Sequence, residues 1–208
     1  MVSITGRIAG LIVLGMTAGC ASSGTSQAAP RMDWRAIATE PDRARLRDWR
    51  SAWVQAIDKA KASGHGAEIA AEGALLHPDA ALAGATPPVG DYRCRVIKLG
   101  AKAKGALDYV SYPSFTCRIA EEGGMLSFTK LDGSQRPCGF LFPGDGSRMI
   151  FLGTMLLSDE RKPLDYGRDR ERDMAGAFER IGDRRWRLAL PYPHWESTLD
   201  VVEITPIG

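Results

Sequence analysis

The chain has 208 residues, of which 44% are apolar and 25% are charged, and its formal net charge is +2. A chain of this length allows one sizeable domain, or one domain with an appendage, and this composition excludes a disordered or fibrous protein. The positive charge is too small for a protein whose main partner is nucleic acid, so nucleic-acid binding is not predicted.

An export signal is predicted over residues 1–19. Arg7 precedes a short apolar run that ends in small residues directly before Cys20, which is typical of a secretory signal peptide. The run is too short to span a membrane. The segment resembles a bacterial lipoprotein signal, which implies cleavage before Cys20 and a lipid on that cysteine as the membrane anchor. Ala21 in the next position implies an outer-membrane lipoprotein that faces the periplasm. The alternative is an ordinary signal peptide with an incidental cysteine.

Residues 20–32 are mostly small or polar. A segment of this composition cannot bury enough apolar surface to fold, so a flexible tether is predicted. Such a tether would separate a lipid anchor from a folded periplasmic domain.

Residues 33–89 are predicted to form a helical segment that packs on a β domain. Apolar residues recur at spacings of three and four over residues 41–63, so they share one face of a helix. Trp49 and Trp53 lie on this face, which we interpret as docked on the β domain; a helix that binds a partner is the alternative. A weaker helix is predicted over residues 66–76, before a connector stiffened by two prolines.

Residues 90–208 are predicted to form an antiparallel β domain, because short apolar runs alternate with turns rich in Gly, Asp and Pro. The eight strand candidates are residues 91–99, 114–120, 125–131, 135–142, 148–157, 173–181, 184–190 and 198–205.

Apolar and polar residues alternate in several of these candidates, so each strand has one buried face. The predicted fold is α+β and mainly β: an eight-stranded antiparallel up-and-down barrel, preceded by the helical segment. A two-sheet sandwich is the alternative. The interior of such a barrel is either filled by side chains or holds one small ligand, and the bulky Phe, Met and Trp residues favour a filled interior.

Three cysteines lie in the predicted barrel: Cys94, Cys117 and Cys138. An exported protein can form disulfides, and three cysteines allow at most one pair within the chain. Cys94 and Cys117 fall at comparable positions of successive strands, so we predict a disulfide between them and a buried free thiol at Cys138. Pairing of Cys138 with either of the others is the alternative. Three cysteines without a nearby histidine do not indicate a zinc site, and no metal or cofactor is predicted.

The loop before the last strand holds the residues with the clearest chemical potential. His194, Trp195 and Glu196 follow one another there, and they are the candidate binding loop at one end of the barrel. His194 and Glu196 could do acid–base work if the fold held them together, with Asp200 or a tyrosine nearby. A structural corner in which Trp195 caps the core is the interpretation that we favour. No nucleophile elbow, phosphate-binding glycine loop or paired-carboxylate pattern is present, so no catalytic residue is assigned.

Three segments carry a family resemblance: residues 90–100, 133–136 and 196–203. Together they resemble the uncharacterised domain-of-unknown-function family numbered 4893, whose members are exported proteins of alphaproteobacteria. The resemblance implies an exported location, and it brings no activity and no catalytic residue. In architecture alone, the predicted barrel is similar to lipocalin-like small barrels, including periplasmic protease inhibitors; fold likeness does not establish function.

These observations favour a non-catalytic envelope lipoprotein. The predicted function is a binding or inhibitor module for a small apolar ligand or for an envelope protein, attached to the membrane through the lipid on Cys20. A hydrolase that acts on envelope material is the alternative.

Overall fold

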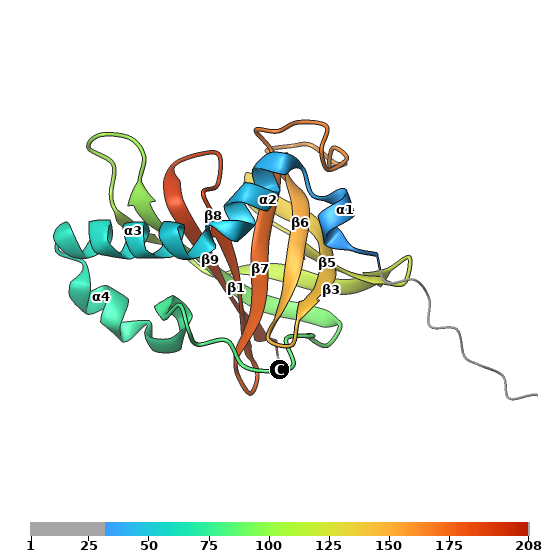
Figure 1. Ribbon diagram of the computed structural model, residues 1–208, viewed down its shortest axis with the longest axis horizontal. Helices are drawn as coiled ribbons and strands as arrows, with labels where there is room; N and C mark the ends of the chain where they lie inside the picture. The colour runs from blue at the N-terminus through green and yellow to red at the C-terminus, as the bar shows by residue number, and fades with distance from the viewer. Residues whose placement is uncertain (1–31, 208) are drawn as a thin grey trace, which may run out of the picture. The chain divides into compact units, whose positions relative to one another are not determined.

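The computed structural model describes residues 32–207 (Figure 1). The predicted signal peptide, Cys20 and almost all of the predicted tether lie outside the described residues. The helices come first in the chain, and the last of them is a 3-10 helix. They are α1 Trp34–Ile37, α2 Glu40–Arg47, α3 Trp49–Ala62, α4 Gly66–Ala71 and η1 Gly73–Leu76.

The strands follow without any intervening helix. They are β1 Gly90–Ala101, β2 Tyr109–Ser111, β3 Phe115–Glu122, β4 Met125–Lys130, β5 Gln135–Asp145, β6 Arg148–Leu157, β7 Asp173–Gly182, β8 Arg185–Pro191 and β9 Ser197–Pro206.

The strands form one antiparallel sheet in the order β2-β1-β3-β4-β5-β6-β7-β8-β9. β1 pairs with β3 and also with β9, so the sheet closes on itself as an eight-stranded barrel. From β3 to β9 each strand pairs with the next one in the chain, which is the up-and-down arrangement predicted from the sequence. β2 is an additional strand beside the C-terminal half of β1.

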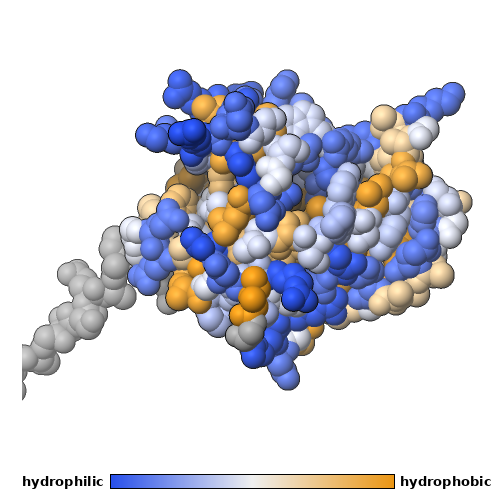
Figure 2. Space-filling model, turned by 180° about the vertical axis from the view of Figure 1, so that it is seen from behind, coloured by the Kyte–Doolittle hydropathy of each residue, from blue (hydrophilic) through white to orange (hydrophobic). Residues whose placement is uncertain are grey.

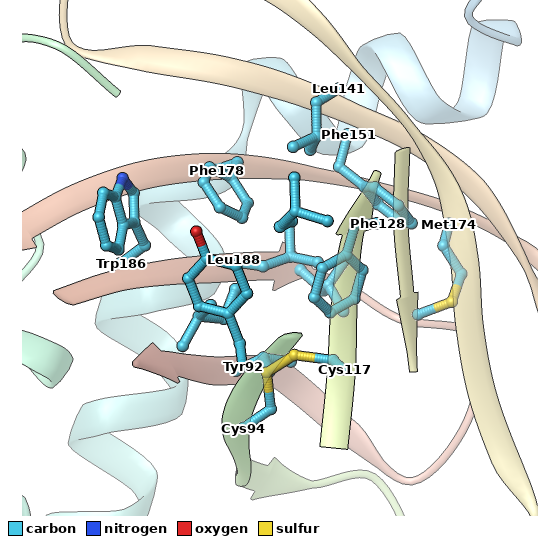
Figure 3. Close-up of a cluster of buried hydrophobic side chains, with 14 of the residues drawn as sticks. Tyr92, Cys94, Cys117, Phe128, Leu141, Phe151, Met174, Phe178, Trp186 and Leu188 are labelled. Atoms are coloured by element: carbon cyan, nitrogen blue, oxygen red, sulfur yellow. A yellow bond between two sulfur atoms is a disulfide. The ribbon is translucent and has the colours of Figure 1, made fainter. Parts of the chain in front are cut away.

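Side chains fill the barrel interior (Figure 3). The interior cluster includes Tyr92, Phe128, Phe151, Phe178 and Leu188, each at most 2% exposed. Two residues of this cluster, Cys94 and Cys117, form a disulfide with a Cα–Cα distance of 6.0 Å. It is the pair that the sequence favoured, and Cys138 is free and buried. The barrel therefore has an apolar core, and not an open ligand cavity, at its centre.

The helices pack on the outer surface of the barrel (Figure 1). α3 contacts β1, β8 and β9, where Trp53 and Ala56 pack against Leu99, Leu199 and other outward side chains. α1 contacts β5 and α2 contacts β7. Helices cover the outer face of these strands and the barrel core packs against their inner face, so both faces carry apolar side chains.

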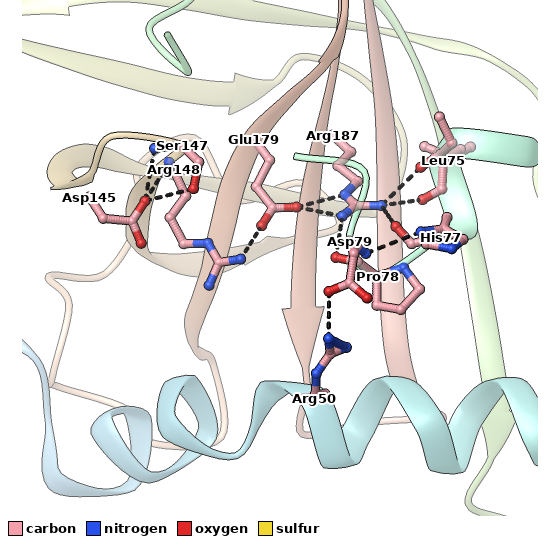
Figure 4. Close-up of polar contacts among 11 residues, drawn as sticks. Arg50, Leu75, His77, Pro78, Asp79, Asp145, Ser147, Arg148, Glu179 and Arg187 are labelled. Atoms are coloured by element: carbon pink, nitrogen blue, oxygen red, sulfur yellow. Dashed lines mark hydrogen bonds and ion pairs between the residues drawn. The ribbon is translucent and has the colours of Figure 1, made fainter. Parts of the chain in front are cut away.

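Arg187, a member of a buried ion pair between two strands, joins the helical cover to the barrel (Figure 4). Arg187 of β8 is 0% exposed and its Nε donates to Oε2 of Glu179 on β7 at 2.7 Å. Its Nη1 donates to the carbonyl oxygens of Leu75 and His77, at 3.0 and 2.7 Å. The guanidinium carbon also lies 4.5 Å from the centre of the Trp53 ring. This one side chain therefore links β8, on which it lies, to β7, η1 and α3.

The structure corrects the predicted elements in two places. The single helix predicted over residues 41–63 is two helices that meet at Asp48, which has a non-helical ψ of 14°. The break lets the two helices follow the curved outer surface of the barrel, where α2 contacts β7 and α3 contacts β1 and β9. β2 was missed because three residues show no alternation. The structure also decides which face of β5 is enclosed: Phe140 and Phe142, which share a strand face with Cys138, pack in the cluster outside the barrel. Alternation in a sequence separates the two faces of a strand without saying which one is inside.

Candidate functional site

Polar side chains replace apolar ones at one end of the barrel interior. Lys98 follows Val96 by two residues on β1, and Lys130 follows Phe128 by two residues on β4. Val96 and Phe128 pack in the interior cluster, so alternation directs both lysines toward the inside of the barrel. Asp200 of β9 is the register partner of Lys98. This end of the barrel is called the mouth below.

Lys98 connects the charged groups at the mouth. Its Nζ lies within contact distance of the Glu196 carboxylate, 3.2 Å from Oε1 of Gln135 and 3.8 Å from Oδ2 of Asp200. The side chain is only 13% exposed. Burial alone would lower the pKa of Lys98, but Asp200 and Glu196 raise it above its ordinary value. Lys98 is therefore a charged, fully engaged residue at neutral pH.

The two carboxylates beside Lys98 have different surroundings. Asp200 is buried, and burial raises its pKa in spite of Lys98 and a hydrogen bond donated by the Ser197 hydroxyl. Glu196 is half exposed, and the hydrogen bond from Lys98 lowers its pKa. Glu196 also has a φ of 64°, a left-handed conformation that is rare for a non-glycine residue. The loop before β9 thus holds this carboxylate over the mouth.

The three residues of the predicted binding loop lie at this mouth but do different things. Trp195 packs against the interior cluster, as expected of a structural corner. The His194 ring stands edge-on to Trp195 with centroids 5.5 Å apart, and its Nε2 is 3.9 Å from Oε1 of Glu171. No hydrogen bond joins His194 to Glu196 among the described residues. The hydrolase alternative therefore remains a prediction from the sequence alone.

A pocket of about 410 Å³ opens beside this charged cluster. We call it the mouth pocket. Its wall combines apolar and polar side chains, among them Val96, Tyr112, Phe115, Lys130, Gln135 and Glu196. A neighbouring hollow, whose lining includes Met155, Met174, Trp195 and Asp200, has a volume of only about 20 Å³, which is room for about one water molecule. A ligand of larger size therefore fits in the mouth pocket and not in this neighbouring hollow.

Sequence reasoning missed Lys98, Lys130 and Gln135 as site residues. The signal that could have found the lysines is a charged residue at an inward position of an alternating strand, where an apolar residue is expected. The three segments that carried the family resemblance supply Lys98, Gln135 and Glu196. These residues lie far apart in the chain, and the closed sheet brings them into hydrogen-bond contact.

A second hollow, of about 620 Å³, lies between α3, α4 and η1. Its lining is mostly apolar and includes Trp53, Ile57, Ile69 and Leu76. It has the size of a ligand site, and Asp58, Lys61 and His77 are the ionisable residues of its lining. More polar side chains converge at the mouth, where Lys98, Lys130 and Glu196 line the pocket together. We therefore take the mouth pocket as the candidate site.

On the face opposite that of Figure 1, polar residues dominate and apolar residues form small separate patches (Figure 2).

Within residues 32–207, no group of three or more His, Cys, Asp and Glu side chains is arranged to hold a metal ion. In the same residues, no helix has both the length and the apolar character needed to cross a membrane.

Comparison with known proteins gave one family. The model of a domain of unknown function, DUF4893, matches residues 34–204, which include the mouth pocket and the strands of the barrel except the last two residues of β9. No curated protein and no solved structure matches the chain.

Proposed function

The chain belongs to the DUF4893 family, and from that premise we propose that it is a non-catalytic binding module that takes one small ligand in the mouth pocket. The observation that carries the proposal is the composition of this pocket. Val96, Tyr112 and Phe115 give it an apolar wall, while Lys130, Gln135 and Glu196 bring polar groups to the same space. In a ligand site, polar groups that converge beside an apolar wall fix the orientation of the ligand and provide specificity.

The shape of the site suits a ligand that has an apolar body and a polar end. The apolar body would lie against Phe115 and Tyr112, and the polar end would meet the charged groups of β1, β4 and the loop before β9. This differs in place from a ligand held at the centre of the barrel, because side chains fill that centre. The proposal keeps the small ligand predicted from the sequence and moves it to the end of the barrel.

Native mass spectrometry of the protein purified from its own host tests this proposal. We expect a non-covalent small molecule to remain on the wild-type protein. Ser134 is an exposed residue of the mouth pocket, and the variant Ser134→Trp should lose the molecule by filling the pocket. Leu107→Trp places the same side chain on an exposed loop outside the pocket and should retain it.

Two outcomes would overturn the proposal. A wild-type protein with no bound molecule would shift the function toward docking on an envelope protein. A molecule that survives Ser134→Trp but is lost from Ala70→Trp, which fills the hollow between α3 and α4, would place the site in that hollow instead.

We also propose that the protein is an outer-membrane lipoprotein that faces the periplasm, anchored through Cys20. The residues before Cys20 support this, and so does the disulfide between Cys94 and Cys117, since disulfides persist in oxidising compartments. Metabolic labelling with an alkyne fatty acid should label the wild-type chain and the Cys138→Ser variant, and it should not label Cys20→Ser. Equal labelling of Cys20→Ser would contradict the anchor.

A further inference from the structure

Lys130 is a cation at the mouth that the described residues leave without an ion pair. Lys98 contacts both carboxylates of the cluster, Glu196 and Asp200. The ammonium of Lys130 instead lies 4.2 Å from the centre of the Phe115 ring, and no carboxylate of residues 32–207 comes within ion-pair distance of it. A cation over an aromatic face is only modestly stabilised, so Lys130 retains the capacity to bind an anion.

The surroundings of Lys130 make an incoming anion favourable. Burial lowers its pKa, and the positive charges of Lys98 and Arg136 act in the same direction, while Asp132 opposes them. A negative charge brought next to Nζ would reduce the repulsion from these two cations and replace the water that burial has removed. The site therefore has a partly desolvated cation that faces a pocket and lacks a counter-ion.

The same surroundings limit the charge of the anion. Glu196 and Asp132 also line the mouth pocket, and they would repel a doubly charged group such as a phosphate monoester more than a singly charged one. The apolar wall formed by Val96 and Phe115 favours a ligand whose remaining part is apolar.

Resting on the proposed function, we propose that the mouth pocket selects carboxylic acids with an apolar body, and that Lys130 binds the carboxylate. Lys98 is not the anchor, because its ammonium already contacts Glu196, Gln135 and Asp200. Lys130 makes an ion pair with the ligand over the Phe115 ring, and the apolar chain extends along the wall of the pocket.

Titration of the full mature protein with octanoate and with 1-octanol, followed by amide chemical shifts, tests the assignment. Octanoate should shift residues of the mouth pocket and bind about tenfold more tightly than the alcohol, as expected for one partly buried ion pair. Lys130→Gln should abolish this difference, and Lys130→Arg should keep most of it. Lys104→Gln, on an exposed loop, is the matched control and should bind as the wild type does.

Each outcome decides one of the two proposals. If octanoate and octanol shift the mouth pocket equally, and Lys130→Gln changes neither, the pocket binds ligands and the carboxylate assignment is wrong. If octyl phosphate binds more tightly than octanoate, the singly charged class is wrong. If none of the three probes shifts the mouth pocket, the carboxylate assignment fails; the proposed function then depends on the molecule retained in the mass spectra. Lys130→Gln is accepted only if its amide spectrum keeps the dispersion of the folded wild type.

Discussion

Arg187 is a charged residue with no exposed surface, and every part of its guanidinium group has a partner. Glu179 accepts from two of its nitrogens, backbone carbonyls of η1 and the following residues accept from it, and the Trp53 ring covers it. Removing one member of a buried ion pair leaves the other charge without compensation inside the protein, which costs more than the pair itself contributes.

We therefore expect Arg187→Met to lower the free energy of unfolding by about 3–5 kcal/mol. Urea unfolding followed by tryptophan fluorescence measures this. Arg118→Met is the control, because Arg118 forms its ion pair with Asp91 on the exposed surface and should matter little. If Arg187→Met and Arg118→Met unfold at similar urea concentrations, the buried pair does not hold the helical cover to the barrel.

Gly139 and Gly153 face one another across β5 and β6, where the backbones leave no room for a side chain. A Cβ added at Gly139 would lie 2.3 Å from the carbonyl oxygen of Leu152. Since the obstacle is backbone, the two strands would have to separate. The close approach of β5 and β6 therefore requires glycine at both positions, and a larger residue at either one would disturb the sheet.

Gly139→Ala is expected to lower the free energy of unfolding by about 1–3 kcal/mol, the usual cost of forcing an extra group into a packed region. Gly146→Ala is a matched control, because a Cβ there would meet no atom within 4 Å. Thermal unfolding of the two variants should therefore separate them clearly. Equal melting temperatures would show that β5 and β6 adjust without cost.

At the scale of elements, a second ionic contact holds the helical cover to the sheet. Glu72 lies between α4 and η1, and its carboxylate accepts two hydrogen bonds from Arg95 of β1, at 2.7 and 2.5 Å. Arg95 also contacts Glu203 of β9, so the contact spans the seam where β1 and β9 close the barrel. The hydrogen bonds from Arg95 lower the pKa of Glu72 below its ordinary value of 4.5.

A carboxyl group whose pKa is lower in the folded state stabilises the fold above its unfolded pKa and loses this effect as the pH falls through the folded pKa. We therefore expect Glu72→Gln to be less stable than the wild type at pH 7, with a difference that shrinks as the pH falls below 4.5. Urea unfolding from pH 7 to pH 3 measures it. Glu121→Gln, on the exposed end of β3, is the control, and a constant difference for Glu72→Gln would contradict the argument.

At the scale of the whole molecule, the helices complete the fold of the barrel. The outer faces of β1 and β9 carry Ile97, Leu99, Leu199 and Val201, each 0% exposed beneath α3 and its neighbours. Without the helices these side chains would form an exposed apolar patch, and Arg187 would lose the carbonyl oxygens and the Trp53 ring that the helical segment supplies. The boundary predicted at residue 90 is therefore a change of secondary structure, and the part of the chain on each side depends on the other.

A fragment of residues 90–208 is expected to aggregate or to unfold without a cooperative transition, whereas residues 31–208 should unfold cooperatively. Size-exclusion chromatography and near-ultraviolet circular dichroism during heating distinguish the two. A monomeric 90–208 fragment with a sharp transition and wild-type aromatic signals would mean that the helices are an attachment to a self-sufficient barrel.

Local patterns in the sequence determined the secondary structure and much of the architecture. Alternation and turn chemistry identified the strands of the barrel, and the positions of Cys94 and Cys117 in successive strands indicated their disulfide. These features are readable because a strand repeats every two residues and a hairpin turn needs particular residues, whatever the rest of the chain does.

The tertiary structure alone decided which groups meet. Pairing of β1 with β9 places Lys98 beside Glu196 and Asp200, and the closed sheet adds Gln135 and the cation of Lys130. It also decided that Cys138 and Phe142 face outward, because a strand pattern has two faces and does not say which one is enclosed. The strands could thus be predicted from short segments, while the candidate site depends on contacts between residues 37 to 98 positions apart in the chain.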